Sequence, residues 1–292
     1  MTAILVGTDD GLHRLDGEAA LRGAAVDDVA VGWVAAGGTV HRRNAAGWSD
    51  VGAVDGLEVT CVAPIEDGAI AGTGGAHLVA VGDGPSERVA SFDDAPTRGE
   101  WHTPWGGPPA VRSISVSPDG TRYVNVHVGG ILRSDADTWA ATIDLHTDVH
   151  QVLAIDGWVL AALGVGGLGI SRDRGASWSF DDDGLHATYC RAIAVAGNTI
   201  LLSASTGPGG RRAAVYRRPL DGEGSFERCV AGLPEWFNAN VDTHCLAADG
   251  DLALIGARSG EVYRSEDAGM SWERIADGLP PIRCVALSDA GT

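Results

Sequence analysis

Three histidines stand beside short apolar segments, where their imidazoles could meet in the folded chain. His150 and His244 begin two such segments, and His127 ends a third. Neutral imidazoles that converge from different segments bind transition metals such as Zn, Fe, Cu or Mn, with a position left open for water or substrate. We therefore predict a metal site formed by His127, His150 and His244. No ligand motif of fixed spacing accompanies these residues, so hydrogen-bonded packing and metal-free acid–base catalysis stay open as alternatives.

Further residues that could catalyse or bind occur near the same positions. Asp148 and Asp242 precede His150 and His244 by two residues and could orient or replace them, although solvated turns account for them as well. Arginine can hold a carboxylate with two parallel hydrogen bonds, and tryptophan in a long loop often covers a pocket. The candidate catalytic residues are His150, His244, His186 and Tyr189. The candidate substrate-binding residues are Arg112, Arg191, Arg283, Trp101, His102, Trp236 and Phe237.

Every basic residue of this chain is an arginine. The sequence has 21 basic and 39 acidic residues, a formal net charge of −18, and no lysine. A Schiff-base lysine and a P-loop lysine are therefore absent, and we expect neither a pyridoxal phosphate nor a nucleotide cofactor. A strongly anionic surface is repelled by nucleic acids and anionic lipids, so we expect no nucleic-acid or membrane partner.

The cysteines and the amino-terminal residues indicate in which cellular compartment the protein is expected. There are five cysteines, an odd number, and no two of them form a Cys-x-x-Cys pair. Free thiols are typical of a reducing compartment. The first residues lack a basic stretch followed by an apolar run, and no segment reaches the roughly 18 apolar residues of a membrane span. We expect a cytoplasmic protein.

The segments that carry these residues follow one repeated pattern: a strand that ends in a small residue, a glycine turn and a second strand that often ends in arginine. The pattern occurs seven times, starting at Ala3, Gly32, Ala69, Tyr123, Leu160, Ile200 and Leu252. Seven repeats in 292 residues give about 42 residues each, which is the length of one four-stranded propeller blade. We predict an all-β protein, a single seven-bladed β-propeller domain over residues 1–292.

The two ends of the chain complement each other. Apolar inner strands precede most hairpins, but the first hairpin has none before it, and the last such strand, RCVALSDAGT, has no hairpin after it. Pairing of the carboxy-terminal strand with the amino-terminal blade closes the ring and removes its open edges. The inner strands then begin at one face, where the candidate residues gather.

Two segments match the pattern Ser-x-Asp-x-Gly-x-Ser-Trp: SRDRGASW at 171–178 and SEDAGMSW at 265–272. They resemble the Asp-box, or BNR, repeat of sialidase, xyloglucanase and sortilin-like propellers. Shortened forms remain at 134–139 and 220–226. In that family the box lies on the outer part of each blade, so the resemblance implies structural roles for these Asp and Trp residues and selects no activity.

The resemblance leaves the function open. A sialidase needs a Phe/Tyr-Arg-Ile-Pro segment, which is absent, so we exclude that activity. Two hypotheses remain. One is an enzyme, a metal-dependent hydrolase or lyase that binds a small molecule at the histidine-rich end of the channel. The other is a non-catalytic protein-binding scaffold, which predicts a broad apolar patch on the rim. The concentration of titratable residues at inner-strand starts favours the enzyme.

Overall fold

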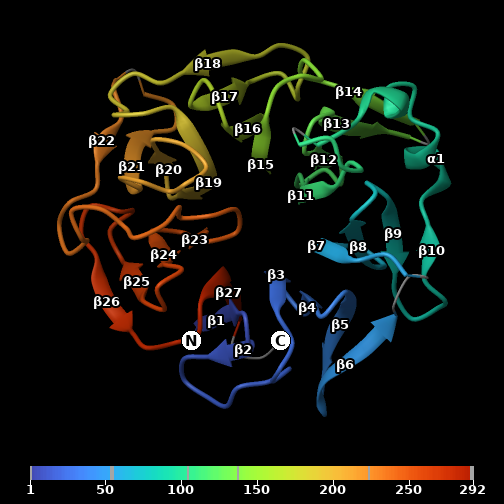
Figure 1. Cartoon of the computed structure of the whole chain (residues 1–292), viewed down its shortest axis with the longest axis horizontal. Coiled ribbons are helices and arrows are strands. Elements are labelled where there is room, and N and C mark those ends of the chain that lie inside the picture. The colour runs from blue at the N-terminus through green and yellow to red at the C-terminus, as the bar shows by residue number, and fades with distance from the viewer. Residues whose placement is uncertain (1, 53–55, 104, 137, 223, 290–292) are drawn as a thin grey trace.

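The computed structural model describes residues 2–52, 56–103, 105–136, 138–222 and 224–289. Seven antiparallel sheets surround a central axis in a closed ring, and almost no helix is present (Figure 1). Six sheets have four strands. The seventh has three strands and is extended at its outer side by a bridge between Leu12 and Ala20. The predicted seven-bladed propeller is confirmed.

The seven blades follow one another around the ring in chain order. Blade one holds β27 (Ile282–Asp289), β1 (Thr2–Thr8) and β2 (Gly11–Arg14). Blade two holds β3 (Val26–Ala30), β4 (Trp33–Ala36), β5 (Thr39–Asn44) and β6 (Gly47–Gly52). Blade three holds β7 (Val59–Ile65), β8 (Gly68–Thr73), β9 (Leu78–Val81) and β10 (Glu87–Arg88). Blade four holds β11 (Val111–Val116), β12 (Arg122–Val126), β13 (Gly130–Asp135) and β14 (Thr138–Ala141).

Blades five to seven have the same order of strands from the axis outward. Blade five holds β15 (Val149–Ile155), β16 (Trp158–Leu163), β17 (Leu168–Ser171) and β18 (Ser179–Asp181). Blade six holds β19 (Tyr189–Ala196), β20 (Thr199–Ser205), β21 (Ala214–Pro219) and β22 (Glu227–Arg228). Blade seven holds β23 (Leu246–Asp249), β24 (Leu252–Gly256), β25 (Val262–Ser265) and β26 (Glu273–Ala276). The helix α1 (Ala90–Asp93) and the 3₁₀ turn η1 (Arg98–Glu100) lie between blades three and four.

The ring closes through the two ends of the chain. β27 pairs antiparallel with β1 from Thr2 opposite Asp289 to Thr8 opposite Ile282. The carboxy-terminal strand is thus the inner strand of blade one, as the sequence predicts. Because the last strand is hydrogen-bonded to the first, the ring has no open edge at this seam.

Apolar side chains fill the spaces between neighbouring blades. Leu160 and Leu168 of blade five, for example, pack in one buried cluster with Ile193 and Leu202 of blade six. Each fully buried Leu or Ile contributes about 1.5–3 kcal/mol from removal of apolar area from water. The core is therefore a circle of blade-to-blade contacts.

A β-bulge interrupts the inner strand of six blades near its start. At each bulge one extra residue of the inner strand has no partner in the second strand. Bulges often re-aim a side chain next to a functional site. The bulge residues are Asp27, Thr60, Arg112, His150, Arg191 and Arg283. In blade seven the same place is taken by a turn at Asp242–Cys245, where His244 has a φ of 64°.

The two Ser-x-Asp-x-Gly-x-Ser-Trp segments form equivalent turns. Asp173 accepts hydrogen bonds from the Ser171 hydroxyl and from the backbone N–H of Ser177, and Gly175 has a φ of 88°. The segment at 265–272 repeats these bonds. In the shortened segments, Asp137 and Glu223 lie outside the described residues. The hydrogen bonds of the complete segments therefore stabilise the turns on the outer side of blades five and seven.

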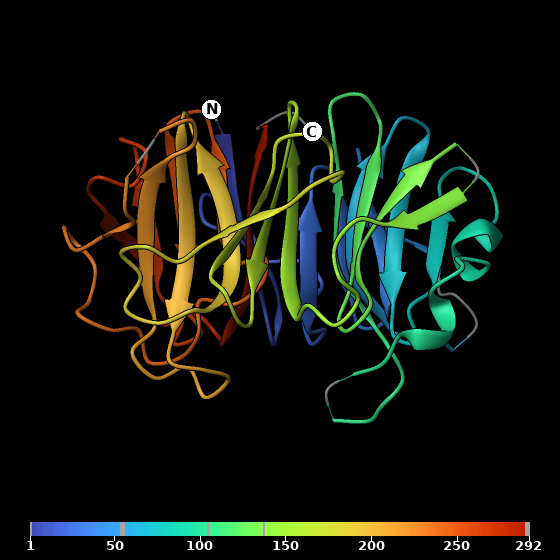
Figure 2. The same cartoon turned by 90° about the horizontal axis from the view of Figure 1, so that it is seen from above.

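One long loop projects from the face at which the inner strands begin. Figure 2 shows this teal loop, residues 101–110, standing away from the ring on the connection into blade four. It carries Trp105, whose side chain is 73% exposed. Within the described residues, no helix has both the length and the apolar character needed to cross a membrane.

Candidate metal centre at the channel mouth

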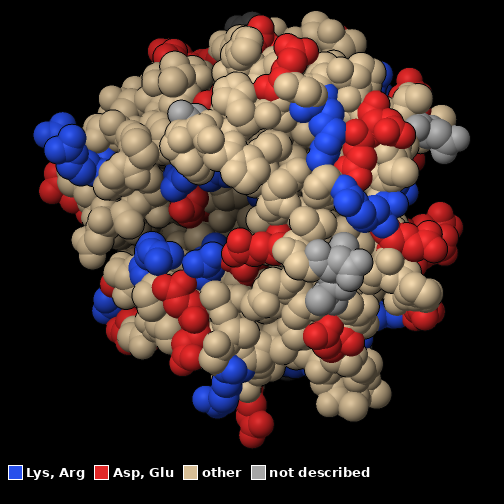
Figure 3. All heavy atoms as spheres, turned by 45° about the vertical axis from the view of Figure 1, so that its right-hand side comes forward, with Lys and Arg blue, Asp and Glu red and all other residues tan. Residues whose placement is uncertain are grey.

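The bulge residues surround a hollow at this face of the ring. A cavity of about 410 Å³ is lined by five of them and by parts of blade seven. Figure 3 shows the hollow with arginine and acidic side chains together on its rim. Propeller bulges therefore collect polar residues from separate blades around one opening. The charged lining residues are Asp27, Glu58, Arg112, Arg191, Asp242, Arg258 and Arg283.

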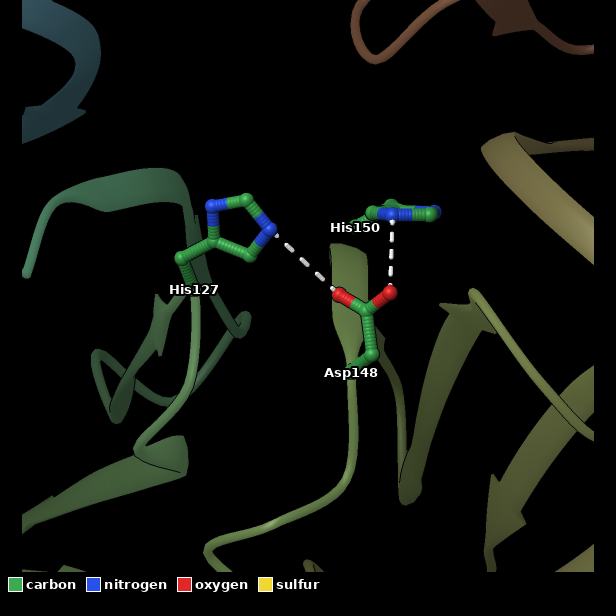
Figure 4. Close-up of side chains that lie close together, drawn as sticks. All are labelled: His127, Asp148 and His150. Carbon is green, nitrogen blue, oxygen red and sulfur yellow. Dashed lines mark ion pairs between the residues drawn. The ribbon is translucent and has the colours of Figure 1, made fainter. Parts of the chain in front are cut away.

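Three side chains lie close together beside this cavity, and one of them, His127, belongs to its lining. The Nε2 atom of His127 lies 3.5 Å from Oδ1 of Asp148, and the Nε2 atom of His150 lies 3.4 Å from the other carboxylate oxygen (Figure 4). The ligand atoms of all three residues lie within 4.8 Å of one another. His127 follows β12, and Asp148 and His150 flank the first residue of β15. Two neighbouring blades thus place three metal-ligating groups at one point.

The hydrogen bonds around the group fix where the imidazole protons lie. Nδ1 of His150 lies 2.6 Å from the carbonyl oxygen of Cys190, which can only accept, so Nδ1 carries the proton and Nε2 has a lone pair. Arg112 donates through Nη1 to Nε2 of His127 at 3.2 Å, so this nitrogen also accepts. Both Nε2 atoms therefore carry a lone pair, and that of His127 accepts the N–H of Arg112.

The charge state of the carboxylate depends on where the imidazole protons lie. Burial lowers the pKa of His150, whose side chain is 1% exposed, and so favours the neutral imidazole. Burial raises the pKa of Asp148, whereas hydrogen bonds from His127 and His150, made when their Nε2 atoms carry a proton, lower it by more and bring it well below its usual range. Asp148 is therefore ionised at neutral pH, and its buried Oδ1 has no hydrogen-bond donor among the described residues.

An anionic carboxylate and two neutral imidazole nitrogens form a donor set that suits a divalent transition metal. Ligand atoms about 2.0–2.1 Å from a tetrahedral ion are separated by roughly 3.3 Å, close to the 3.4 and 3.5 Å found here. Donation of the other imidazole N–H to a backbone carbonyl, as His150 does, is the usual support for a metal-binding histidine. The group could hold a metal ion.

Gly164 provides the space that the Asp148 carboxylate occupies. A Cβ atom at residue 164 would lie 2.1 Å from Oδ2 of Asp148 and 3.1 Å from the His150 ring. The backbone N–H of Gly164 also donates to the Asp148 carbonyl at 2.7 Å. Any larger residue here must displace the carboxylate, so Gly164 positions a candidate metal ligand.

The third predicted metal ligand, His244, lies elsewhere in the channel. Its Nδ1 is 3.4 Å from Oδ1 of the buried Asp28, and its Nε2 donates to the carbonyl of Arg112 at 3.2 Å. It reaches from blade seven to blades two and four and lines both the mouth cavity and a second cavity of about 630 Å³ farther down the axis. His244 therefore spans the channel between the two cavities.

The predicted substrate-binding arginines all line the mouth cavity, but their partners differ. Arg191 forms an ion pair with Asp242 at 2.8 Å. Arg283 forms ion pairs with Asp27 and, at 3.1 Å, with Asp9. All three arginines occupy bulge positions equivalent to that of His150.

The predicted aromatic and loop residues lie at varied distances from the mouth. The Tyr189 ring contacts the His150 ring, with centroids 4.8 Å apart. The His186 imidazole instead pairs with the hydroxyl of Tyr216 at 2.7 Å and packs against Trp236. The remaining predicted residues, Trp101, His102 and Phe237, are not in the cavity lining. Trp101 and Phe237 are buried in blade-to-blade clusters, and His102 is exposed beside the Glu100 carbonyl.

The sequence indicates Asp148 as a residue that could orient or replace His150, but it does not single out Trp105. Asp148 precedes His150 by two residues, and this i, i+2 spacing at the start of a strand was the available signal. Trp105 follows Trp101 in the long loop, but it is Trp105 that lines the cavity and packs edge-on against His127, with centroids 4.9 Å apart.

No family model matches this chain, and no curated protein matches it either. Among solved structures, it resembles the WD40 repeats of RRP9 (TM-score 0.63, 13% identity, 98% of this chain and 88% of that one). It also resembles virginiamycin B lyase from Staphylococcus aureus (TM-score 0.63, 13% identity, 94% and 87%). The chain shares the propeller fold with both.

A third resemblance is to the GH74 xyloglucanase of Xanthomonas campestris, with a TM-score of 0.61 and 16% identity. It covers 94% of this chain and 46% of the xyloglucanase, so this chain spans just under half of that enzyme's length. At such identities the likeness shows the fold alone, and the similar proteins include both enzymes and WD40 domains. The function has to be argued from the site.

Proposed function

We propose that this protein is a metal-dependent enzyme, a hydrolase or lyase, that acts on a small molecule at the channel mouth. The observation that carries the proposal is the cluster of His127, Asp148 and His150, whose ligand atoms lie within 4.8 Å of one another and of which His127 lines the cavity. Oδ1 of Asp148 is buried and has no hydrogen-bond donor among the described residues, and a cation bound between this oxygen and the two Nε2 atoms would stabilise it.

Different residues would bind the metal ion and orient the substrate. His127, Asp148 and His150 hold the ion, and the Cys190 carbonyl keeps His150 in the tautomer that can ligate. A bound divalent ion would supply Lewis acidity, either to a water molecule or to a carbonyl oxygen. Arg112 and Tyr189, which lie against the two histidines, are placed to orient a substrate and to exclude water from it.

Elemental analysis of untagged protein tests the proposal. We expect about one equivalent of Zn, Fe, Cu or Mn, lost in Asp148→Asn and in the double variant His127→Ala/His150→Ala. His146→Ala is the matched control, because His146 is an exposed histidine four residues before His150. Added metal at 100 times its Kd should also raise the free energy of unfolding by about 2.7 kcal/mol. Absence of metal together with absence of stabilisation by all four ions would refute the metal centre.

The protein-scaffold hypothesis has less support from the surface. Among the described residues, the exposed large apolar side chains are spread over blades two, four, five, six and seven. A scaffold would concentrate them in one patch. The exposed residues are Val31, Trp105, Val165, Phe180, Val230 and Met270.

Two finer assignments accompany the proposal. The equivalent hydrogen bonds of the turns at 171–178 and 265–272 support the inference that both are Asp-box repeats. All five cysteines are buried and free, which supports a reducing compartment and hence our expectation of the cytoplasm. Burial also raises the pKa of each thiol, that of Cys229 to about 11, so these residues are unreactive packing groups.

A further inference from the structure

Arg112 differs from the other arginines at the mouth in its charge balance. Arg191, Arg258 and Arg283 each form an ion pair with an aspartate. No ion pair of the described residues involves Arg112, whose guanidinium contacts a neutral imidazole nitrogen instead. A partly buried cation without a carboxylate partner is stabilised when an anion binds beside it.

Trp105 presents an apolar surface at the same cavity. It packs edge-on against His127, to which Arg112 donates a hydrogen bond, and both Trp105 and Arg112 line the cavity. Trp105 is 73% exposed, so contact with a flat apolar group would remove its ring from water and stabilise the bound state. The cavity of about 410 Å³ is within the usual size range of small-molecule pockets.

We propose that the substrate class is an aromatic carboxylate: Arg112 binds the carboxylate, and Trp105 contacts the aromatic ring. This inference rests on the proposed function, because it places the reacting part of the molecule beside His127, Asp148 and His150. Arg112 can pair with both carboxylate oxygens through parallel N–H bonds, which a neutral amide cannot accept. The acidic surface, with its net charge of −18, makes nonspecific anion binding weak elsewhere.

The Arg112 hydrogen bond to His127 links carboxylate binding to metal binding. Nη1 of Arg112 donates to the Nε2 lone pair that a metal ion would use, so the ion and this hydrogen bond exclude each other. Metal binding therefore releases the guanidinium toward the cavity, and each ligand should raise the affinity for the other. Removal of the guanidinium should weaken carboxylate binding and tighten metal binding.

Calorimetry with phenylacetate and its neutral analogue phenylacetamide tests the carboxylate site on the metal-loaded protein. Arg112→Gln should lower the affinity for phenylacetate by about 10- to 100-fold and leave the weak binding of phenylacetamide unchanged. Arg258→Gln is the matched control, because it removes the same charge from the same cavity lining but from an arginine that already has a carboxylate partner. Equal losses in the two variants, or no binding of phenylacetate by the wild type, would overturn the proposal.

A second variant isolates the aromatic contact. The wild type should bind phenylacetate more tightly than acetate, and Trp105→Ala should reduce this preference by about 3- to 10-fold without affecting acetate. An unchanged preference would remove Trp105 from the proposal.

Metal titration of Arg112→Gln separates this inference from the proposed function. Tighter metal binding with lost carboxylate binding supports both. Metal bound normally with no response to phenylacetate in any variant overturns the carboxylate inference and leaves the metal centre intact. Weaker binding of both ligands would show that Arg112 only supports the local structure.

Discussion

The absence of a side chain at Gly164 leaves room for the Asp148 carboxylate, and a larger residue at position 164 would not fit beside it. A methyl group there would overlap Oδ2 of the carboxylate. We therefore expect Gly164→Ala to weaken metal binding by about 10- to 100-fold, the effect usual for the loss of a group that orients a ligand. Metal titration followed by elemental analysis checks this. Gly209→Ala is the control, since a Cβ at residue 209 meets nothing within 4 Å. Equal metal affinity in both variants would show that Asp148 is not a ligand.

Asp267 makes the free energy of unfolding depend on pH in the acidic range. Hydrogen bonds from the Ser271 hydroxyl and backbone, and from the Ser265 hydroxyl, lower its pKa to about 2. Because the pKa is lower in the folded chain than the usual value of about 3.9, this residue contributes stability above roughly pH 4 that is lost as the pH falls toward 2. Urea unfolding between pH 6 and 2 should show a shallower decline in Asp267→Asn than in the wild type. Parallel declines would contradict this account.

The metal site could be predicted only in part because side-chain direction depends on backbone detail. The sequence indicates His127 and His150 by type and position. It also favours His244, but the positive φ at this residue turns its imidazole toward Asp28. Asp148 reaches the site because residues two apart at a strand start share one side. A single φ angle thus decides which residues meet, and the residue types alone do not encode that angle.

At the scale of the element, side chains of the inner strands join neighbouring blades. The hydroxyl oxygen of Ser113 in β11 accepts the backbone N–H of Val152 in β15 at 3.0 Å, and both groups are buried. Ser113→Ala would leave this N–H without an acceptor, so we expect a loss of about 1–3 kcal/mol in the free energy of unfolding. Ser225→Ala, at an exposed serine, should change it by less than about 0.5 kcal/mol. Chemical denaturation measures both, and similar effects would refute the blade-joining role.

The strands themselves were predictable because their signals are local. Short Val-, Ile- and Ala-rich runs between glycine turns predict hairpins, and the structure has a hairpin at each of the seven repeats. The bulges were not predictable, because the extra residue in β15 or β11 is defined only by the register of its partner strand. The bulges aim the candidate residues, so the fold follows from the sequence more completely than the site does.

For the whole molecule, stability depends on the seam between β1 and β27. Deletion of residues 282–292 removes the inner strand of blade one and exposes the edge of β1. We expect the truncated chain to lose its cooperative thermal transition and to self-associate. A synthetic peptide of residues 280–292 should restore the transition, and a scrambled peptide should not. Circular dichroism and size-exclusion chromatography provide the measurements. A truncated chain that unfolds cooperatively as a monomer would contradict this role of the seam.

The repetition of one bulge in six blades has a consequence for redesign. Each of Asp27, Thr60, Arg112, His150, Arg191 and Arg283 is presented by the same backbone geometry, and none is needed for the hydrogen bonds that close its sheet. The backbone of each position can therefore carry another side chain, and the ion pairs of Arg191 and Arg283 are the contacts that such a change removes. A combinatorial library over these positions would sample new chemistries at the mouth while the scaffold stays constant, which is how a single ring of blades can acquire unrelated activities.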